Sequence, residues 1–273
     1  MSLAPIVKFA SKSFTLPNTC VRLRSVLDDP KSDVEDMAKV MSLDPSLSAK
    51  VLKLANSALF RFPSQVSSVP KALSIIGGEA AYNISIAETA NLAFKSFECS
   101  QINFDHFWNK AVLNGLIAKS IVQQKQIRGS ERYFVLGILQ NLSELVCATR
   151  LPEKYAIYTE IKRHKLPLAA QKDVFGFTFS QCSGLILETW RLPEALYLPL
   201  KQLDYEDVTS QSFEANVLYI AQAMSFLELG SEMFEHEMVE AKVADAIGLS
   251  EDDYDIILAF ALAESQKIAA VLK

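Results

Sequence analysis

The side chains that most often do chemistry in proteins are few in this 273-residue sequence. It contains three histidines, His106, His164 and His236, and no two of them can meet on one helix. Zinc sites of the HExxH type and other paired helical histidines need such spacing. The sequence therefore predicts no histidine-based metal site, and we expect a structural or surface role for each histidine.

Motifs that activate a nucleophile or hold a phosphate group are also absent. The sequence has no GxSxG, P-loop or GxGxxG pattern. Its four cysteines, Cys20, Cys99, Cys147 and Cys182, are far apart and form no CxxC pair, which favours reduced core thiols. We therefore expect no catalytic residue, no bound metal and no cofactor, and a protein that acts by binding rather than by catalysis.

One polar pair occurs where polar groups are costly. Gln140 and Asn141 interrupt residues 132–149, the most apolar stretch of the chain. A buried amide costs about 1–3 kcal/mol unless it is hydrogen-bonded. Two interpretations stay open: the pair bonds to neighbouring helices and fixes their packing, or it marks a former or altered active site.

The elements that would position these residues are helices. Asp44 can cap free amides and Pro45 suits a first helical position, after which Leu47, Val51 and Leu54 share one stripe. Gly (9) and Pro (10) are scarce and no alternating strand pattern occurs, so the sequence predicts an all-α fold of about a dozen or more helices. The expected helices cover residues 19–27, 33–41 with Val34, Met37, Ala38 and Met41 inward, 79–97, 104–124, 132–149 as one buried helix, 213–229 and 251–272, with others beginning near Pro70, Pro152, Pro167 and Pro193.

The polar stretch 98–103 is the expected boundary between two lobes. An N-terminal helical lobe would cover residues 1–100 and a C-terminal lobe residues 101–273.

Charge is distributed unevenly along the chain. Residues 1–200 hold 23 Lys and Arg against 17 Asp and Glu, whereas residues 201–273 hold 4 against 15. The acidic third, which includes Glu232, Glu235, Glu237 and Glu240, would repel a nucleic-acid backbone, so we expect no nucleic-acid partner. It is either a solvated helical face or a docking surface for a basic partner.

No apolar run reaches the roughly 18–20 residues that span a bilayer, and the first residues lack a secretory signal pattern. We therefore expect a cytoplasmic protein with no membrane partner.

Two ordered motifs resemble those of the HDOD family, helical bacterial signalling domains related to HD-type phosphohydrolases. Residues 44–57 are similar to its DPxLxxxxLxxxNS signature, and residues 68–77 to its SIxxAIxxLG signature. Phe107-Trp108 and residues 190–193 match its FW and WxLP landmarks. The signature positions are Asp44, Pro45, Leu54, Asn56, Ser57, Ser68, Ala72, Gly77, Trp108, Trp190 and Pro193. The resemblance covers roughly residues 16–229 as one unit and implies an HD-like multi-helix bundle.

The resemblance also implies a lost metal site. Related enzymes hold a metal with a His, an adjacent His-Asp pair and a later Asp, and many family members keep remnants in a GLLHDIG segment. Residues 137–143 correspond to that segment, so Gln140-Asn141 replaces the His-Asp pair. The positions that correspond to the former ligands define a degenerate pocket: Lys110, Gln140, Asn141, Ser180 and Gln222.

Three functional hypotheses follow. The first is a non-catalytic signal-transduction or scaffolding protein that binds other signalling proteins of unknown identity. The second is a sensor that holds a nucleotide or a small anion in the former pocket, and the third is a residual metal-dependent phosphohydrolase. Asn56 and Ser57 could line a groove between the lobes or form a helix-end turn.

Overall fold

The computed structural model describes residues 3–60, 62, 64–203, 212–228 and 247–273. Every regular element in these ranges is a helix and none is a strand, which confirms the all-α prediction. None of the described helices is both long enough and apolar enough to cross a bilayer. The acidic residues 232–240, including His236, lie outside the described residues.

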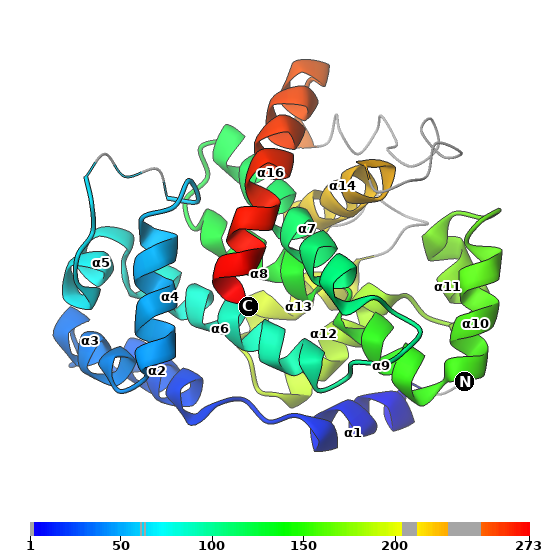
Figure 1. Cartoon of the computed structure of the whole chain (residues 1–273), viewed down its shortest axis with the longest axis horizontal. Helices are drawn as coiled ribbons and strands as arrows, with labels where there is room; N and C mark the ends of the chain where they lie inside the picture. The colour runs from blue at the N-terminus through cyan, green and yellow to red at the C-terminus, as the bar shows by residue number, and fades with distance from the viewer. Residues whose placement is uncertain (1–2, 61, 63, 204–211, 229–246) are drawn as a thin grey trace.

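The first six helices form the part of the molecule drawn from blue to cyan in Figure 1. Three of them begin at a short polar side chain that caps free amides: the Asp44 carboxylate accepts from the Leu47 amide at 3.0 Å, Ser68 accepts from the Lys71 amide, and Asp33 and Asp36 form a reciprocal capping box. The helices are α1 (Ala4–Ser13), α2 (Asn18–Asp28), α3 (Val34–Ser42), α4 (Pro45–Ala55), α5 (Val69–Ile76) and α6 (Gly78–Lys95).

Among the remaining helices, α7 is buried along most of its length and packs against α8, α14 and α16. The remaining helices are α7 (Phe104–Gln124), α8 (Ser130–Leu139), α9 (Leu142–Arg150), α10 (Pro152–Ile161), α11 (Pro167–Phe175), α12 (Phe179–Thr189), the short 3₁₀ helix η1 (Glu194–Leu196), α13 (Leu198–Gln202), α14 (Phe213–Glu228) and α16 (Glu251–Leu272).

Two predictions about helices were wrong. Residues 132–149 form two helices rather than one, because α8 ends at Leu139 and α9 begins at Leu142. Gln140 and Asn141 are the break itself, where amide side chains bond to other helices. Val34 is 39% exposed instead of buried because, although it shares the stripe of Met37 and Met41, it is the first residue of α3 and its neighbours Asp33 and Glu35 are exposed.

The division into lobes at residues 98–103 stays a prediction. This stretch does separate α6 from α7. Helix α1, however, packs against α9 and α12, which belong to the predicted C-terminal lobe, so the first helix extends across the predicted boundary (Figure 1).

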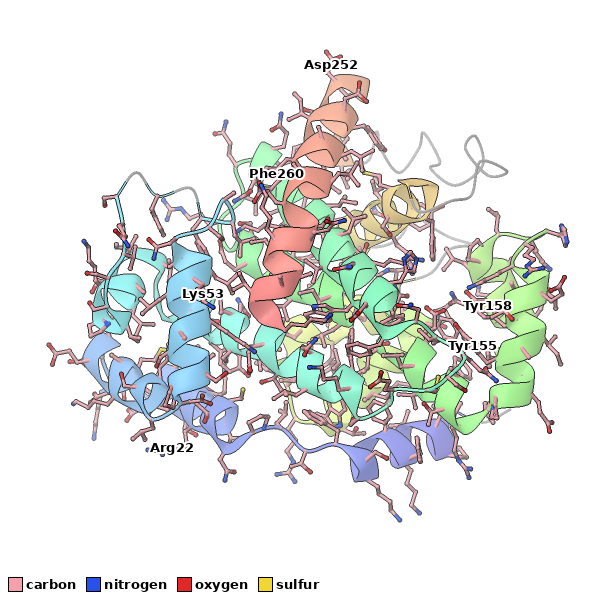
Figure 2. The ribbon with its side chains drawn as sticks, in the orientation of Figure 1. Arg22, Lys53, Tyr155, Tyr158, Asp252 and Phe260 are labelled. Carbon is pink, nitrogen blue, oxygen red and sulfur yellow. The ribbon has the colours of Figure 1, made fainter. Side chains whose placement is uncertain are left out.

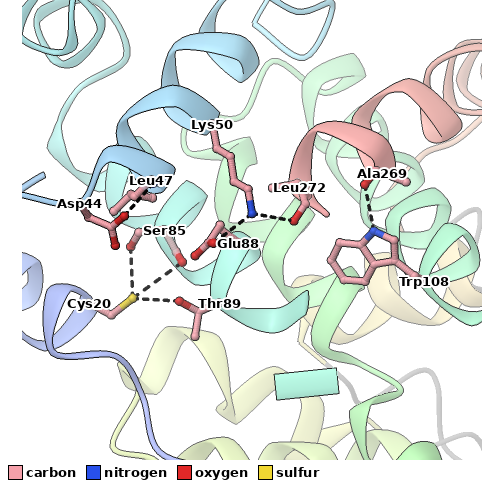
Figure 3. A network of polar contacts seen from close by, with 10 residues as sticks. All are labelled: Cys20, Asp44, Leu47, Lys50, Ser85, Glu88, Thr89, Trp108, Ala269 and Leu272. Carbon is pink, nitrogen blue, oxygen red and sulfur yellow. Dashed lines mark hydrogen bonds and ion pairs between the residues drawn. The ribbon is translucent and has the colours of Figure 1, made fainter. Parts of the chain in front are cut away.

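Helix α16 lies across α4, α6 and α7 and is fastened near its C-terminal end (Figure 3). The Lys50 ammonium lies 3.0 Å from Glu88 and donates to the Leu272 carbonyl at 3.3 Å. The fully buried Trp108 indole donates to the Ala269 carbonyl at 3.0 Å. The C-terminal helix is therefore an integral part of the core and joins early and late helices.

Candidate functional site

A chain of four buried amides occupies the break between α8 and α9. Asn114 on α7 donates through Nδ2 to Gln140 Oε1 at 3.0 Å, and Gln140 Nε2 donates to Gln222 Oε1 on α14 at 2.8 Å. Gln222 Nε2 in turn donates to Asn141 Oδ1 at 2.8 Å. All four residues are at most 7% exposed. We call this set the amide network; it joins α7, α14 and the α8–α9 break.

Two backbone carbonyls fix which side-chain atoms of the amide network donate and which accept. Asn114 Nδ2 also donates to the Gly137 carbonyl at 2.7 Å, and Gln140 Nε2 also lies 3.4 Å from the Leu218 carbonyl. A carbonyl can only accept, so an amide nitrogen must face each of them. The donors and acceptors of Gln140 are thereby assigned without ambiguity.

A close approach of two helices places the amide network. Gly115 on α7 and Gly137 on α8 face each other so closely that a Cβ on Gly137 would lie 2.6 Å from Gly115 Cα. A Cβ on Gly115 would lie 2.5 Å from the Phe134 carbonyl oxygen. Both positions require glycine, because only backbones without side chains can approach this far. The contact brings Asn114, next to Gly115, against the end of α8.

The amide network does not fit the metal centre of HD-type enzymes. Such a centre needs anionic oxygens and imidazole nitrogens with free lone pairs. The network offers neutral amides, and both polar atoms of Gln140 are engaged in hydrogen bonds. Its one buried acceptor without a partner is Asn114 Oδ1, a neutral carbonyl oxygen. Among the described residues, no three His, Cys, Asp or Glu side chains converge as a metal-binding group.

Lys110 lies one helical turn before Asn114 on α7. Its ammonium is 3.7 Å from the centre of the Phe226 ring, and Phe226 lies one turn beyond Gln222 on α14. Burial lowers the pKa of Lys110 to about 8, an effect that Glu144 opposes and Lys162 reinforces. The structure therefore places Lys110 beside the amide network, with a cation–π contact and no ion pair to a described residue.

Glu144, the carboxylate that acts on the pKa of Lys110, is hydrogen-bonded to another residue. The Tyr155 hydroxyl on α10 donates to Glu144 at 2.9 Å (Figure 2 labels Tyr155). Burial, with Glu144 as the second cause, raises the pKa of Tyr155. Tyr155 is thus a neutral hydrogen-bond donor at neutral pH, and Glu144 is oriented toward α10.

Ser180 is not part of the amide network. It is 1% exposed on α12, and its hydroxyl has no hydrogen-bond partner among the described residues. The polar contacts between α9 and α12 are made by Ser143, whose hydroxyl donates to the Phe179 carbonyl and whose amide donates to Ser183. Of the five residues predicted to line the pocket, Gln140, Asn141 and Gln222 are hydrogen-bonded together, Lys110 is one turn from Asn114 on α7, and no hydrogen bond joins Ser180 to them.

Asn56 and Ser57 form a helix-end turn. Asn56 Nδ2 donates to the Val66 carbonyl and Asn56 Oδ1 accepts from the Val66 amide, both at 2.8 Å, so one side chain pairs with the backbone of a later loop. The Ser57 hydroxyl donates to the Leu54 carbonyl at 2.6 Å. The same residues also border an open groove with Phe62.

Sequence reasoning missed Asn114 and Lys119. The ammonium of Lys119, which is 1% exposed, donates to the Leu59 carbonyl at 2.7 Å and lies 3.2 Å from Glu131. It fixes the loop after α4 against α7. Both residues lie on α7, whose sequence is apolar on most sides and does not show which polar side chains face inward. The glycine directly after Asn114 was the one feature that could have indicated a close helix contact there.

Comparison with known proteins identifies the kind of domain. The HDOD domain family model matches residues 14–204. An uncharacterized protein of Treponema pallidum (strain Nichols) is 24% identical over 185 residues, which are 66% of this chain and 35% of that protein. The match therefore spans about a third of the length of this curated relative.

Solved structures show the same fold. A protein of Shewanella amazonensis named "Putative phosphohydrolase" has a TM-score of 0.74 at 18% identity, over 98% of both chains. An HDOD domain protein of unknown function from Geobacter sulfurreducens has a TM-score of 0.66 at 20% identity, over 99% of this chain and 96% of that one. A Marinobacter aquaeolei "Putative signal transduction protein" has a TM-score of 0.69 at 20% identity, over 95% of this chain and 59% of that one. At these identities the likeness shows the fold alone.

Proposed function

The chain belongs to the HDOD domain family, and from this premise we propose that it is a non-catalytic signal-transduction or scaffolding protein that acts by binding other proteins. The observation that carries the proposal is the amide network. The family resemblance assigns Gln140, Gln222 and Asn141 to positions of former ligands, and these side chains bond to one another. Neutral amides that are hydrogen-bonded in this way favour a role in helix packing over metal binding.

The fold supports the signalling part of the proposal. One of its structural relatives is named as a signal transduction protein. Another is named as a phosphohydrolase, but the donor set of this chain favours binding over hydrolysis. A binding surface can lie anywhere on the exposed helices, and the acidic start of α16 is the first candidate, since Asp252 and Asp255 are exposed there (Figure 2 labels Asp252).

Affinity capture from the source cell tests this function. The full chain would be used as bait beside a variant that carries Asp252→Asn and Asp255→Asn. The control bait carries Glu98→Gln and Glu194→Gln, which removes two exposed charges elsewhere. We expect a specific partner that the wild type and the control retain and the α16 variant loses. Retention of every partner by the α16 variant would exclude this surface, and absence of any specific partner would contradict the proposal.

A second candidate function is a small-ligand sensor at Lys110. The observation that favours it is Lys110, a half-buried residue whose ammonium forms no ion pair with a described residue and could bind an anion. Thermal shift measurements with cyclic dinucleotides would test it. We expect stabilisation that Lys110→Gln removes; a wild-type protein that is indifferent to them would rule this sensor out for that ligand class.

A further inference from the structure

A cavity of about 460 Å³ lies away from the amide network, where α1, α2 and α6 meet the end of α12. No residue of the amide network lines it. Apolar and polar side chains both line it, and the polar ones include hydroxyl and amide groups: Ser11, Thr15, Asn18, Ser25 and Thr189. Its size is in the range of sites that hold small molecules, which are typically about 300–1,000 Å³.

Arg191 stands at this cavity in an unusual backbone conformation. Its φ is 59°, in the left-handed region that favours glycine. It is the second residue after Thr189, where α12 ends, and the Leu192 amide bonds back to the Leu187 carbonyl at 3.2 Å, which is the Schellman ending of a helix. Glycine usually occupies this position, so the chain accepts backbone strain to keep an arginine there. Strained positions of this kind tend to cluster at functional sites.

The acidic side chain that lines the cavity, Asp28, is paired with Arg24 and not with Arg191. The other lining arginine, Arg24, is held by Asp28 through two hydrogen bonds, and one of its nitrogens lies 3.8 Å from Glu79. The negative charge of Asp28 is thereby compensated. Arg191 is exposed and forms no ion pair or hydrogen bond through its side chain with the residues that the structure describes. The cavity therefore presents one unpaired guanidinium.

Two polar side chains could complete an anion site. Thr15, between α1 and α2, and Asn18, the first residue of α2, are exposed and line the cavity, and their side chains have no hydrogen bond to the described residues. A guanidinium binds phosphate through two parallel N–H donors, and hydroxyl and amide groups add further donors. Donors that lack protein partners are free to bind a ligand without breaking existing bonds.

We propose that this cavity binds a small phosphorylated metabolite, with the phosphate on Arg191 and the remainder of the ligand against Thr15 and Asn18. Since helices from the first hundred residues and the end of α12 both line the cavity, bound ligand would hold these parts together. The proposal is independent of the protein-binding function proposed above.

Isothermal titration and thermal shift with the full chain test the proposal. The probes are AMP, ribose 5-phosphate and, as the matched compound without an anion, adenosine. We expect AMP or ribose 5-phosphate to bind and to raise the melting temperature, and adenosine to do neither. Equal binding of adenosine and AMP would overturn the role of the phosphate, and no binding of either phosphorylated probe at millimolar concentration would overturn the proposal for this ligand class.

Two variants of Arg191 separate loss of binding from loss of folding. Arg191→Gly removes the guanidinium but relieves the left-handed strain, so we expect an unchanged or higher melting temperature together with at least fivefold weaker binding. Arg191→Gln should weaken binding to the same extent. The control is Arg22→Gln, an exposed arginine on α2 that does not line the cavity (labelled in Figure 2). Binding that survives both Arg191 variants, or that is lost equally in the Arg22 variant, would contradict the assignment.

Discussion

The amide network defines the candidate site at the scale of single residues. Each of its hydrogen bonds has a fixed donor and acceptor, because the Gly137 and Leu218 carbonyls require nitrogen atoms opposite them. Such a buried network is costly when incomplete, since every unpaired member keeps its desolvation cost. Exchanging one amide for a carboxyl group should therefore lower the free energy of unfolding strongly.

Gln140→Glu tests the direction of the network. The new carboxylate would face two acceptors, the Leu218 carbonyl and Gln222 Oε1, and we expect it to lower the free energy of unfolding by about 3 kcal/mol at pH 7. Burial would raise the folded-state pKa of the new carboxyl group. The loss should therefore be largest at neutral pH and shrink as the pH falls toward the unfolded value of about 4.3.

Urea unfolding followed by circular dichroism at pH 7 and pH 5 would measure this effect. The control is Gln123→Glu, which changes an exposed glutamine, the second-to-last residue of α7, and should leave stability nearly unchanged. A Gln140→Glu protein as stable as the control would mean that the amides are not bonded as described.

Lys110 should titrate near pH 8 rather than near 10.5, because burial disfavours its charge. Reductive ¹³C-methylation followed by an NMR pH titration would measure this pKa, with the resonance assigned by its absence in Lys110→Gln. The unfolded chain keeps this proton to higher pH, so between about pH 8 and 10.4 the folded state gains stability as pH rises. Lys110→Gln should lack that gain. A Lys110 pKa above 10 would show that the ammonium is well solvated.

At the scale of elements, the crossing of α7 and α8 determines where the network can form. Gly115 and Gly137 let the two backbones touch, and this contact sets Asn114 beside the Gly137 carbonyl. We expect Gly137→Ala to destabilise the protein by about 3 kcal/mol or more, as overpacking against backbone cannot be relieved by a side-chain rotation. Thermal unfolding would measure the loss.

Gly78→Ala is the matched control for that substitution. A Cβ at Gly78 would meet only the flexible side chains of Leu27 and Met37, at 3.0 Å, and alanine favours the helix. We expect a change within about 1 kcal/mol. Similar losses of stability in the Gly137→Ala and Gly78→Ala variants would indicate that the α7–α8 crossing is not exceptionally close.

The sequence predicted most of the helices, but it did not predict the break between α8 and α9 in the apolar stretch 132–149. Capping residues and prolines mark helix starts locally, so α3, α4, α10 and α11 were placed correctly. The break at Gln140 was missed because the apolar residues on both sides are buried against different neighbours, and no proline or glycine marks the end of α8. The pocket could be predicted only in part. Asn114 belongs to it because α7 packs against the end of α8, and the sequence does not show how these two helices pack.

At the scale of the whole molecule, α16 connects the early and late helices. It lies outside the part matched by the family model, yet it covers the fully buried Trp108. Removal of residues 264–273 should expose that indole. In a Trp190→Phe background we expect the tryptophan emission to shift to the red, with Lys267→Gln as the control because the Lys267 ammonium pairs with Glu264, on its own helix. Unchanged emission after the truncation would show that α16 does not cover Trp108.

We propose that hydrogen-bonded amides have taken the place of a catalytic metal centre in this protein. The sharpest test is metal analysis of protein produced with iron, manganese and zinc available and purified without chelator, together with an assay for phosphodiester hydrolysis. We expect well below one equivalent of any of these metals and no hydrolysis above that of a Gln140→Leu variant. A stoichiometric metal, with hydrolysis that the Gln140→Leu variant loses, would contradict it.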